Sequence, residues 1–170
     1  TENVVWWGEV NNPFSRESFV KLKDKVTKHL GGRELWVRDC YAGADVNHRI
    51  GVRVVNEFPW QSIFVNNLFI RPSAPELENF TPDWTILCAP SFKADPAVDG
   101  TRQHNFTIID FTERTILIGG SAYTGEIKKG IFTVMNYLLP LKGFLSMHCS
   151  ANIGKDGDTA VFFGLSGTGK

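Results

Sequence analysis

The chain ends in the stretch Thr159-Ala-Val-Phe-Phe-Gly-Leu-Ser-Gly-Thr-Gly-Lys170. Its first part, Thr159–Phe163, is short, apolar and rich in β-branched and aromatic residues, which predicts a strand. The second part fits Gly-x-x-x-x-Gly-Lys, the loop that cradles phosphate groups in nucleotide triphosphatases and kinases, without the final Ser or Thr. A strand that leads directly into such a loop favours a nucleotide site, and a surface glycine-rich turn is the alternative.

Each residue type in this loop has a physical reason. Glycines at 164, 167 and 169 let the backbone turn with positive φ and bring its N–H groups against phosphate oxygens. Lys170 would reach the β- and γ-phosphates as a point charge. Such a loop also needs the N-terminus of a following helix, which adds partial positive charge. We therefore expect the chain to be a piece of a longer protein.

Composition excludes several classes of partner. The 170 residues suit one domain or the start of a second, and 42% hydrophobic with 21% charged residues is ordinary for a globular protein. Eighteen basic residues balance eighteen acidic ones, so no overall field favours nucleic acid or an anionic membrane. A phosphate ligand must then be held by a local site. We expect small-molecule partners only, and a monomer is favoured.

The cysteines indicate the compartment. Cys40, Cys88 and Cys149 are widely separated and form no C-x-x-C pair, which favours reduced thiols and a cytoplasmic location. No apolar run approaches the roughly 18 residues of a membrane span.

The N-terminal part predicts alternating helices and strands. Ser15 is a candidate N-cap for a helix that Gly31-Gly32 ends. Its apolar positions are Phe19, Leu22, Val26 and Leu30. Strand-like runs follow at Glu34–Tyr41, Gly51–Val55, Trp84–Ala89, Phe106–Phe111 and Thr115–Ile118. Trp60–Ile70 could be a helix, and Ser91–Asn105 reads as a loop.

The C-terminal part changes character after Gly119-Gly120. Gly125–Leu139 has apolar residues three and four apart, which predicts a helix ended by Pro140. Phe144–Cys149 is expected to be a strand, and a turn at Asn152–Asp158 would connect it to Thr159–Phe163. The predicted fold is α/β. Residues 1–143 would form a mixed-sheet domain with flanking helices, and residues 144–170 would begin a phosphate-loop nucleotide-binding domain.

Further candidates for chemistry are Lys128-Lys129, His148 and Tyr123. On the residues alone, Lys128 is expected to face solvent, as surface charge usually does. His148 alone reads as a satisfied histidine near a sheet edge, since no second histidine sits at metal-ligand spacing.

Longer motifs surround these residues. Tyr123-Thr-Gly-Glu-Ile-Lys-Lys-Gly-Ile-Phe132 and Ser146-Met-His-Cys-Ser-Ala-Asn152 are two of them. With Met135–Gly143, Gly154–Asp158 and Phe162–Lys170, they resemble the ATP-dependent phosphoenolpyruvate carboxykinases. Earlier stretches at Asp45–Val55, Trp60-Gln61 and Phe69–Ser73 are also similar to that family, so the resemblance covers most of the chain.

The resemblance implies a reaction and a set of residue roles. Oxaloacetate would lose CO₂, and the resulting enolate would take the γ-phosphoryl group of ATP, with one Mn²⁺ on the substrate side and one Mg²⁺ with the nucleotide. The implied metal ligands are Lys129 and His148, and Tyr123 and Lys129 would contact the substrate. The implied catalytic residues are Lys129, Ser166 and Lys170. The implied ATP contacts are Lys129, His148, Gly164, Leu165, Ser166, Gly167, Thr168, Gly169 and Lys170.

These residue types suit that chemistry. Loss of CO₂ leaves charge on the enolate oxygen, which a metal ion stabilises as it forms. Phosphoryl transfer needs in-line positioning and neutralised phosphate charge, which Lys170 and metal would supply. The imidazole of His148 suits Mn²⁺.

Two other functions are compatible with the loop. A phosphate-loop kinase of another acceptor, such as a protein serine, would share Gly164–Lys170 but would not need the Tyr123–Lys129 stretch. A non-catalytic nucleotide-binding module would keep the loop alone. Because the resemblance implies a further aspartate ligand after the loop and a substrate arginine before Thr1, we expect the chain by itself to be inactive.

Overall fold

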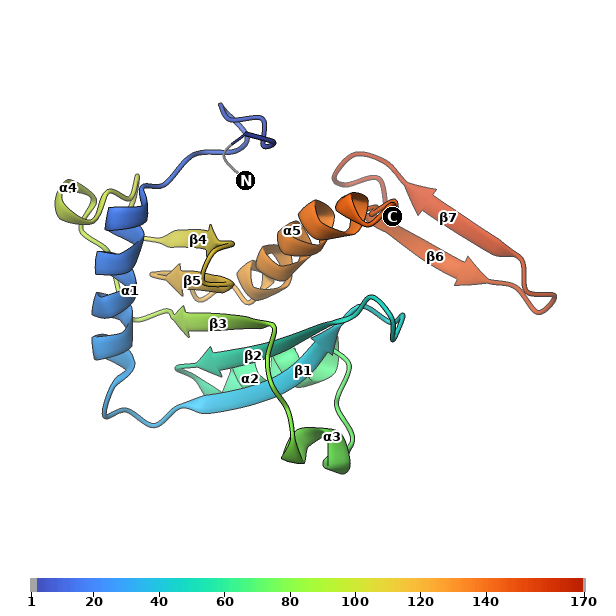
Figure 1. Cartoon of the computed structure of the whole chain (residues 1–170), viewed down its shortest axis with the longest axis horizontal. Helices are drawn as coiled ribbons and strands as arrows, with labels where there is room; N and C mark the ends of the chain where they lie inside the picture. Colours follow the sequence, from blue (N-terminus) through green and yellow to red (C-terminus); the bar gives the residue numbers. More distant parts are fainter. Residues whose placement is uncertain (1–2, 170) are drawn as a thin grey trace. The chain divides into compact units, whose positions relative to one another are not determined.

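The computed structural model describes residues 3–169 (Figure 1). The chain divides into two compact units, Thr1–Ile131 and Phe132–Lys170, and each is described by itself. In the described part of the chain, the helices lack the length and apolar character needed to cross a bilayer.

The first unit is built on a five-stranded mixed sheet. Its strands are β1 (Trp36–Ala42), β2 (Ile50–Asn56), β3 (Trp84–Ala89), β4 (Phe106–Asp110) and β5 (Thr115–Gly119). Their order is β1-β2-β3-β5-β4, with the central β2, β3 and β5 parallel and the two outer strands antiparallel to their neighbours. The prediction of an α/β fold with a mixed sheet and flanking helices is confirmed. The carboxyl ends of β2, β3 and β5 therefore meet at one edge, which is where open α/β sheets bind ligands.

Helix α1 (Arg16–Leu30) covers one face of this sheet, as its pattern predicts. Ser15 Oγ caps it by accepting a hydrogen bond from the Ser18 N–H at 3.0 Å, and Gly31 follows its last residue. The four predicted apolar residues are buried. They form one core cluster with residues of the sheet and its loops, Ala89, Ala94, Phe106 and Leu117.

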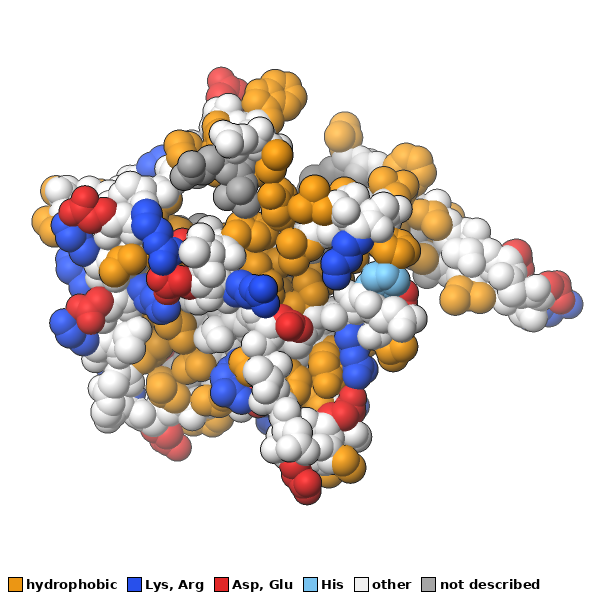
Figure 2. Space-filling model, viewed as in Figure 1, with side chains coloured by type: hydrophobic (Ala, Val, Ile, Leu, Met, Phe, Trp, Pro, Cys, Tyr) orange, Lys and Arg blue, Asp and Glu red, His pale blue; other side chains and the backbone are white. Residues whose placement is uncertain are grey.

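Ion pairs fix α1 from outside the core. Arg16 binds both Asp110 and Glu113 at 2.7 Å, and Lys25 binds Asp99. Basic and acidic side chains are accordingly intermixed over α1 in Figure 2. The helix is thus tied to the β4–β5 turn and to the loop after β3.

The opposite face of the sheet carries α2 (Pro59–Leu68) and the start of α5 (Gly125–Leu141). Gln61 of α2 donates a hydrogen bond to Cys88 Sγ at 3.1 Å, so Cys88 faces α2. Its strand neighbour Leu87 points to the opposite face and packs against the core cluster of α1. The helix expected within Trp60–Ile70 is confirmed.

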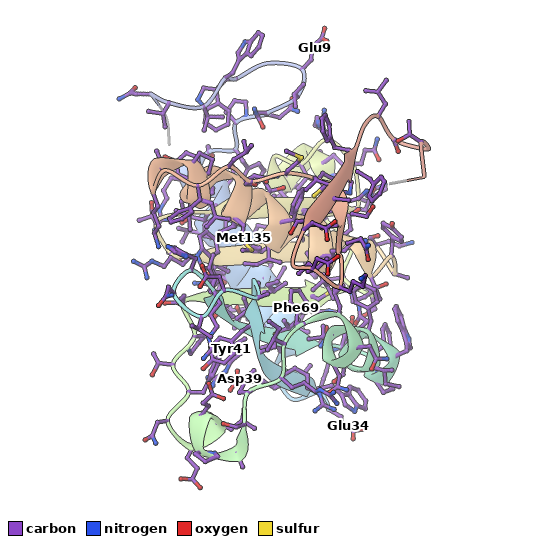
Figure 3. All side chains as sticks on the ribbon, turned by 90° about the vertical axis from the view of Figure 1, so that its right-hand side faces the viewer. Glu9, Glu34, Asp39, Tyr41, Phe69 and Met135 are labelled. Carbon is purple, nitrogen blue, oxygen red and sulfur yellow. The ribbon has the colours of Figure 1, made fainter. Side chains whose placement is uncertain are left out.

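The outer strand β1 is held to β2 by arginine contacts. Arg53 binds Asp39 through two hydrogen bonds of 2.7 and 2.8 Å. The Arg49 guanidinium lies 3.7 Å from the centroid of the Tyr41 ring, a cation–π contact. Figure 3 shows Asp39 and Tyr41 next to each other, as residues two apart on a strand must be.

Two short helices were not predicted. Helix α3 (Ala74–Glu78) lies in a stretch with no predicted element, and α4 (Pro96–Asp99) lies inside the predicted loop Ser91–Asn105. Both helices have N-cap residues that the sequence contains in recognisable form, Ser73 and Asp95. Glu76 accepts hydrogen bonds from Ser73, and Asp95 accepts one from the Ala97 N–H.

The end of α5 also differs. The helix runs through Pro140 to Leu141, so Pro140 lies in its last turn and does not end it. The predicted strand Phe144–Cys149 is wrong except for Cys149. The Phe144 N–H donates to the Leu139 carbonyl at 3.0 Å while Gly143 adopts φ +83°. This is the Schellman form of helix ending, in which the backbone folds back on the last turn and is not extended.

The second unit contains an antiparallel hairpin of β6 (Cys149–Ile153) and β7 (Thr159–Phe163). The predicted strand at Thr159–Phe163 is confirmed. The turn begins at Gly154, later than the predicted Asn152, and is closed by a 2.8 Å hydrogen bond from the Gly154 N–H to the Asp158 carbonyl.

Candidate active site

A glycine turn leads from β5 into the site. Gly120 has φ +66°, and a Cβ there would lie 2.7 Å from the His104 carbonyl oxygen and 2.9 Å from Asn105 Cα. Both are backbone atoms that cannot move aside easily. Glycine is therefore required where the chain leaves the sheet toward Tyr123 and α5.

Tyr123 lies just before α5, and its side chain is exposed. Its N–H donates to Ser121 Oγ at 3.3 Å, and its carbonyl accepts from the Glu126 N–H at 3.2 Å. Lys129 Nζ lies 5.5 Å from the centroid of the Tyr123 ring. The structure therefore brings these two predicted site residues together.

The first turns of α5 present polar groups beside this pair. Lys128 and Lys129 are both exposed, which confirms the expectation that Lys128 faces solvent. Glu126 accepts a hydrogen bond from Thr107 Oγ1 at 2.9 Å and so ties the helix to β4. A carboxylate in the first turn also complements the helix dipole.

His148 belongs to the second unit and is exposed just before β6. Its ring packs against Phe132, with 5.4 Å between centroids and 60° between planes. Lys129 lies in the first unit. An amine and an imidazole are both nitrogen donors that can bind a divalent metal ion.

The other described groups make poorer ligands. No three His, Cys, Asp or Glu side chains within residues 3–169 gather in a way that could hold a metal. Burial raises the pKa of Cys40 and of Cys88 to about 12, so both remain protonated thiols. Metal would therefore need ligands beyond Lys129 and His148.

The glycine loop follows β7. Gly167 and Gly169 have φ of +85° and +82°, as predicted. The same expectation is wrong for Gly164, which is not in the left-handed region; a Cβ there would instead lie 3.0 Å from Thr168 Oγ1. Thr168 Oγ1 donates to the Leu165 carbonyl at 2.8 Å and closes the turn that contains Ser166. Lys170 lies outside the described residues.

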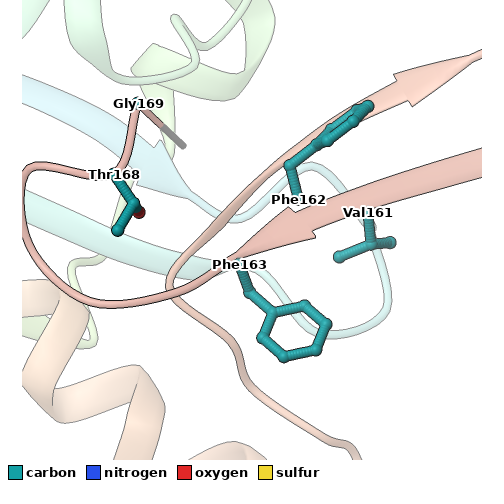
Figure 4. A pocket seen from close by; sticks show the side chains of 5 residues that line it. All are labelled: Val161, Phe162, Phe163, Thr168 and Gly169. Carbon is teal, nitrogen blue, oxygen red and sulfur yellow. The ribbon is translucent and has the colours of Figure 1, made fainter.

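A pocket of about 360 Å³ lies between this loop and β7 (Figure 4). It is lined by Val161, Phe162, Phe163, Thr168 and Gly169. One side of the pocket is apolar strand, and Thr168 and Gly169 of the loop form the other side.

A buried carboxylate lies where β2 ends. Glu57 Oε1 accepts from His29 Nε2 at 3.0 Å, from Arg33 at 3.2 Å and from Ser91 Oγ, while Oε2 accepts from the Ser91 N–H at 2.9 Å. Burial raises its pKa, but the bonds from Ser91 and His29 outweigh burial and hold the pKa below its ordinary value. The same His29 nitrogen contacts both Glu57 and Ser91, so no proton relay connects them and the cluster is structural.

Comparison with known proteins assigns the family. The whole chain, residues 1–170, matches the family described as phosphoenolpyruvate carboxykinase. The chain belongs to the phosphoenolpyruvate carboxykinase family. Three similar proteins are named phosphoenolpyruvate carboxykinase (ATP): those of Flavobacterium johnsoniae, Deinococcus radiodurans and Christiangramia forsetii, with 61%, 56% and 55% identity. The matches cover all of this chain but 32%, 36% and 32% of those proteins, so it spans about a third of the curated relatives.

Sequence reasoning missed two features of this candidate site. One is the Thr107–Glu126 bond, which depends on an i to i+19 contact that no local pattern reveals. The other is Gly125, whose Cα lies against the Tyr123 ring. The glycine-flanked tyrosine was visible in the sequence, but the ring position was not.

Proposed function

We propose that the protein containing this chain converts oxaloacetate and ATP to phosphoenolpyruvate, CO₂ and ADP. Membership of the carboxykinase family and the names of its relatives support this reaction. The observation that carries it at residue level is the approach of Lys129 to Tyr123 at the start of α5. A phosphate-loop kinase or a non-catalytic nucleotide-binding module would not require Lys129 to lie beside Tyr123.

Tyr123, Lys129 and His148 would serve the oxaloacetate side. Tyr123 would contact substrate or CO₂ through its exposed ring, since one side of the ring is already occupied by Gly125. Lys129 and His148 would hold Mn²⁺, each through a nitrogen lone pair. When bound, Mn²⁺ supplies positive charge that stabilises the enolate oxygen.

The glycine loop would serve the ATP side. Gly164, Leu165, Ser166, Gly167, Thr168, Gly169 and Lys170 would surround the phosphates, with Mg²⁺ accompanying the nucleotide. The left-handed conformations of Gly167 and Gly169 support this role, since they allow successive N–H groups to face an anion. Ser166 would lie toward the substrate, and Lys170 would neutralise phosphate charge.

The domain assignment is part of the proposal. Residues 1–143 would be the substrate-side domain, and residues 144–170 would begin the nucleotide-binding domain. We also propose a cytoplasmic protein, supported by three free thiols at Cys40, Cys88 and Cys149. The 170-residue chain would be inactive by itself, because it carries only part of the proposed ligand set.

A coupled assay of the full-length protein tests the reaction. Oxaloacetate conversion to phosphoenolpyruvate would be followed with Mn²⁺ and Mg²⁺, using ATP and then GTP. We expect activity with ATP that falls by at least about a hundredfold in Lys129→Ala and His148→Ala. Lys155→Ala is the matched control, because this lysine lies in the hairpin turn and its loss removes only a charge and an exposed ion pair with Asp156.

Other outcomes would contradict the proposal. ATP binding without phosphoenolpyruvate formation would favour the non-catalytic nucleotide-binding module. Phosphate transfer to a protein serine would favour the kinase. Full activity of the Lys129→Ala protein would show that Lys129 is not a required metal ligand.

A further inference from the structure

The ring of Tyr123 rests on the Cα of Gly125. A Cβ on Gly125 would overlap Cε1 and Cζ of the ring and lie 2.6 Å from Oη. Real Cβ atoms essentially never approach other atoms this closely. We infer that Gly125 is a positioning residue for Tyr123, and that its lack of a side chain fixes where the phenol lies.

Backbone conformation does not explain this glycine. Gly125 is the first residue of α5 and is not in the left-handed region, so any L-residue could adopt its backbone angles. Alanine would even favour the helix, since glycine is the poorer helix former. The steric overlap with the Tyr123 ring gives a reason for glycine at this position.

Hydrogen bonds hold the backbone of Tyr123 on both sides, whereas its side chain is exposed. The Tyr123 N–H is held by Ser121 Oγ, and its carbonyl is held by the Glu126 N–H. A Cβ on Gly125 would therefore be accommodated by rotating the ring off the helix. The ring would then leave its position 5.5 Å from Lys129 Nζ.

This inference rests on the proposed function, in which Tyr123 contacts substrate. It adds that ring placement depends on a residue with no functional group. A displaced ring would weaken use of oxaloacetate and leave ATP binding intact, because misplacement of a contact group by about 1 Å can cost much of a rate.

A double-mutant cycle in the full-length protein tests it. We expect Gly125→Ala to lower kcat/KM for oxaloacetate by about tenfold or more, with KM for ATP changed by less than about twofold. In a Tyr123→Ala background the same substitution should change kcat/KM by less than about twofold, because no ring remains to be displaced. Equal losses in both backgrounds would overturn the inference, since alanine would then act without Tyr123.

A second measurement separates this inference from the proposed function. A crystal structure of the Gly125→Ala protein should show the Tyr123 ring rotated away from α5, and an unmoved ring would overturn the inference whatever the activity. If Tyr123→Ala keeps full activity, the substrate role of Tyr123 fails. The crystal structure of the Gly125→Ala protein then tests by itself whether Gly125 positions the ring. Gly130→Ala is the control: its Cβ would meet Ile116 at 3.2 Å and not Tyr123, so it should leave the ring in place.

Discussion

The carboxylate of Glu57, at the end of β2, contacts two segments that are distant in sequence. It receives hydrogen bonds from His29 at the end of α1, from Arg33 after that helix, and from Ser91 after β3. A buried carboxylate is stable only if its oxygens find donors, and here both oxygens do. One residue therefore fixes α1 to the carboxyl edge of the sheet.

We expect Glu57→Gln to destabilise this unit. The amide would lose the negative charge that faces Arg33 and would turn an N–H₂ group toward other donors. Hydrogen bonds to a charged group contribute about 1.5–3 kcal/mol, so the free energy of unfolding should fall by about that amount. Urea denaturation of the full-length protein, read through amide exchange in α1 and β2, measures it. Glu34→Gln, at an exposed position, should change stability by no more than about 0.5 kcal/mol.

The pH dependence of this effect has a defined sign. Because the folded-state pKa of Glu57 lies below its ordinary value of 4.5, the stabilisation is fully present above that value and is lost as pH falls through the folded pKa. The stability difference between the unmodified protein and Glu57→Gln should therefore be constant near neutral pH and shrink in acid. A difference that grows as pH falls would contradict the role assigned to this carboxylate.

At the scale of elements, the turn between β5 and α5 positions the site. Gly120→Ala should destabilise this turn through two effects. An alanine in the left-handed region costs about 1–2 kcal/mol. Its Cβ would also meet backbone atoms of His104 and Asn105. Gly32→Ala is the matched control, with φ +75° and no atom within 4 Å of its Cβ. We expect Gly120→Ala to lower the free energy of unfolding by about 1–3 kcal/mol more than Gly32→Ala. Equal effects would mean that the contact relaxes without cost.

Local signals in the sequence determined some elements completely. Helix α1 was predictable because its cap at Ser15, its apolar stripe and its glycine end all indicate the same boundaries. The stretch after α5 was not, because Phe144–Cys149 is apolar enough for a strand while the Schellman ending at Gly143 depends on a positive φ. Helix α4 was predictable in retrospect from Asp95-Pro96 and Gly100, but four residues carry little periodicity.

The candidate site was predictable from motifs but not from geometry. The sequence identified Tyr123, Lys129 and the glycine loop by their resemblance to a family. It could not show that the Tyr123 ring lies on Gly125, because ring placement depends on the rotamer and on the hydrogen bonds of the preceding turn. Nor could it show that Glu57 joins α1 to the sheet, because its hydrogen-bond partners come from α1 and from the residue after β3.

At the scale of the whole molecule, the hairpin β6–β7 is a sheet of only two strands in the described residues. One face of the hairpin is largely apolar. Side chains two apart on a strand, and side chains directly opposite on paired strands, point to the same face. The residues that share this face include Cys149, Ala151, Ile153, Val161 and Phe163. Four of the large apolar side chains in this hairpin, Ile153, Val161, Phe162 and Phe163, are exposed. Figure 2 shows apolar side chains at the surface there. A two-stranded hairpin whose large apolar side chains are exposed is marginally stable in water.

We therefore expect the hairpin to be stabilised only in the full-length protein, whose relatives are about three times as long as this chain. Amides of β6 and β7 should exchange at least about a hundredfold faster in the 170-residue chain than in the full-length protein, while β2, β3 and β5 keep their protection in both. Hydrogen exchange with mass spectrometry measures this directly. In the full-length protein Val161→Asp should destabilise the hairpin, whereas Asn152→Asp, on the opposite face, should not. Similar protection of β6 and β7 in both proteins would show that the hairpin holds itself together, and the apolar face would then need another explanation.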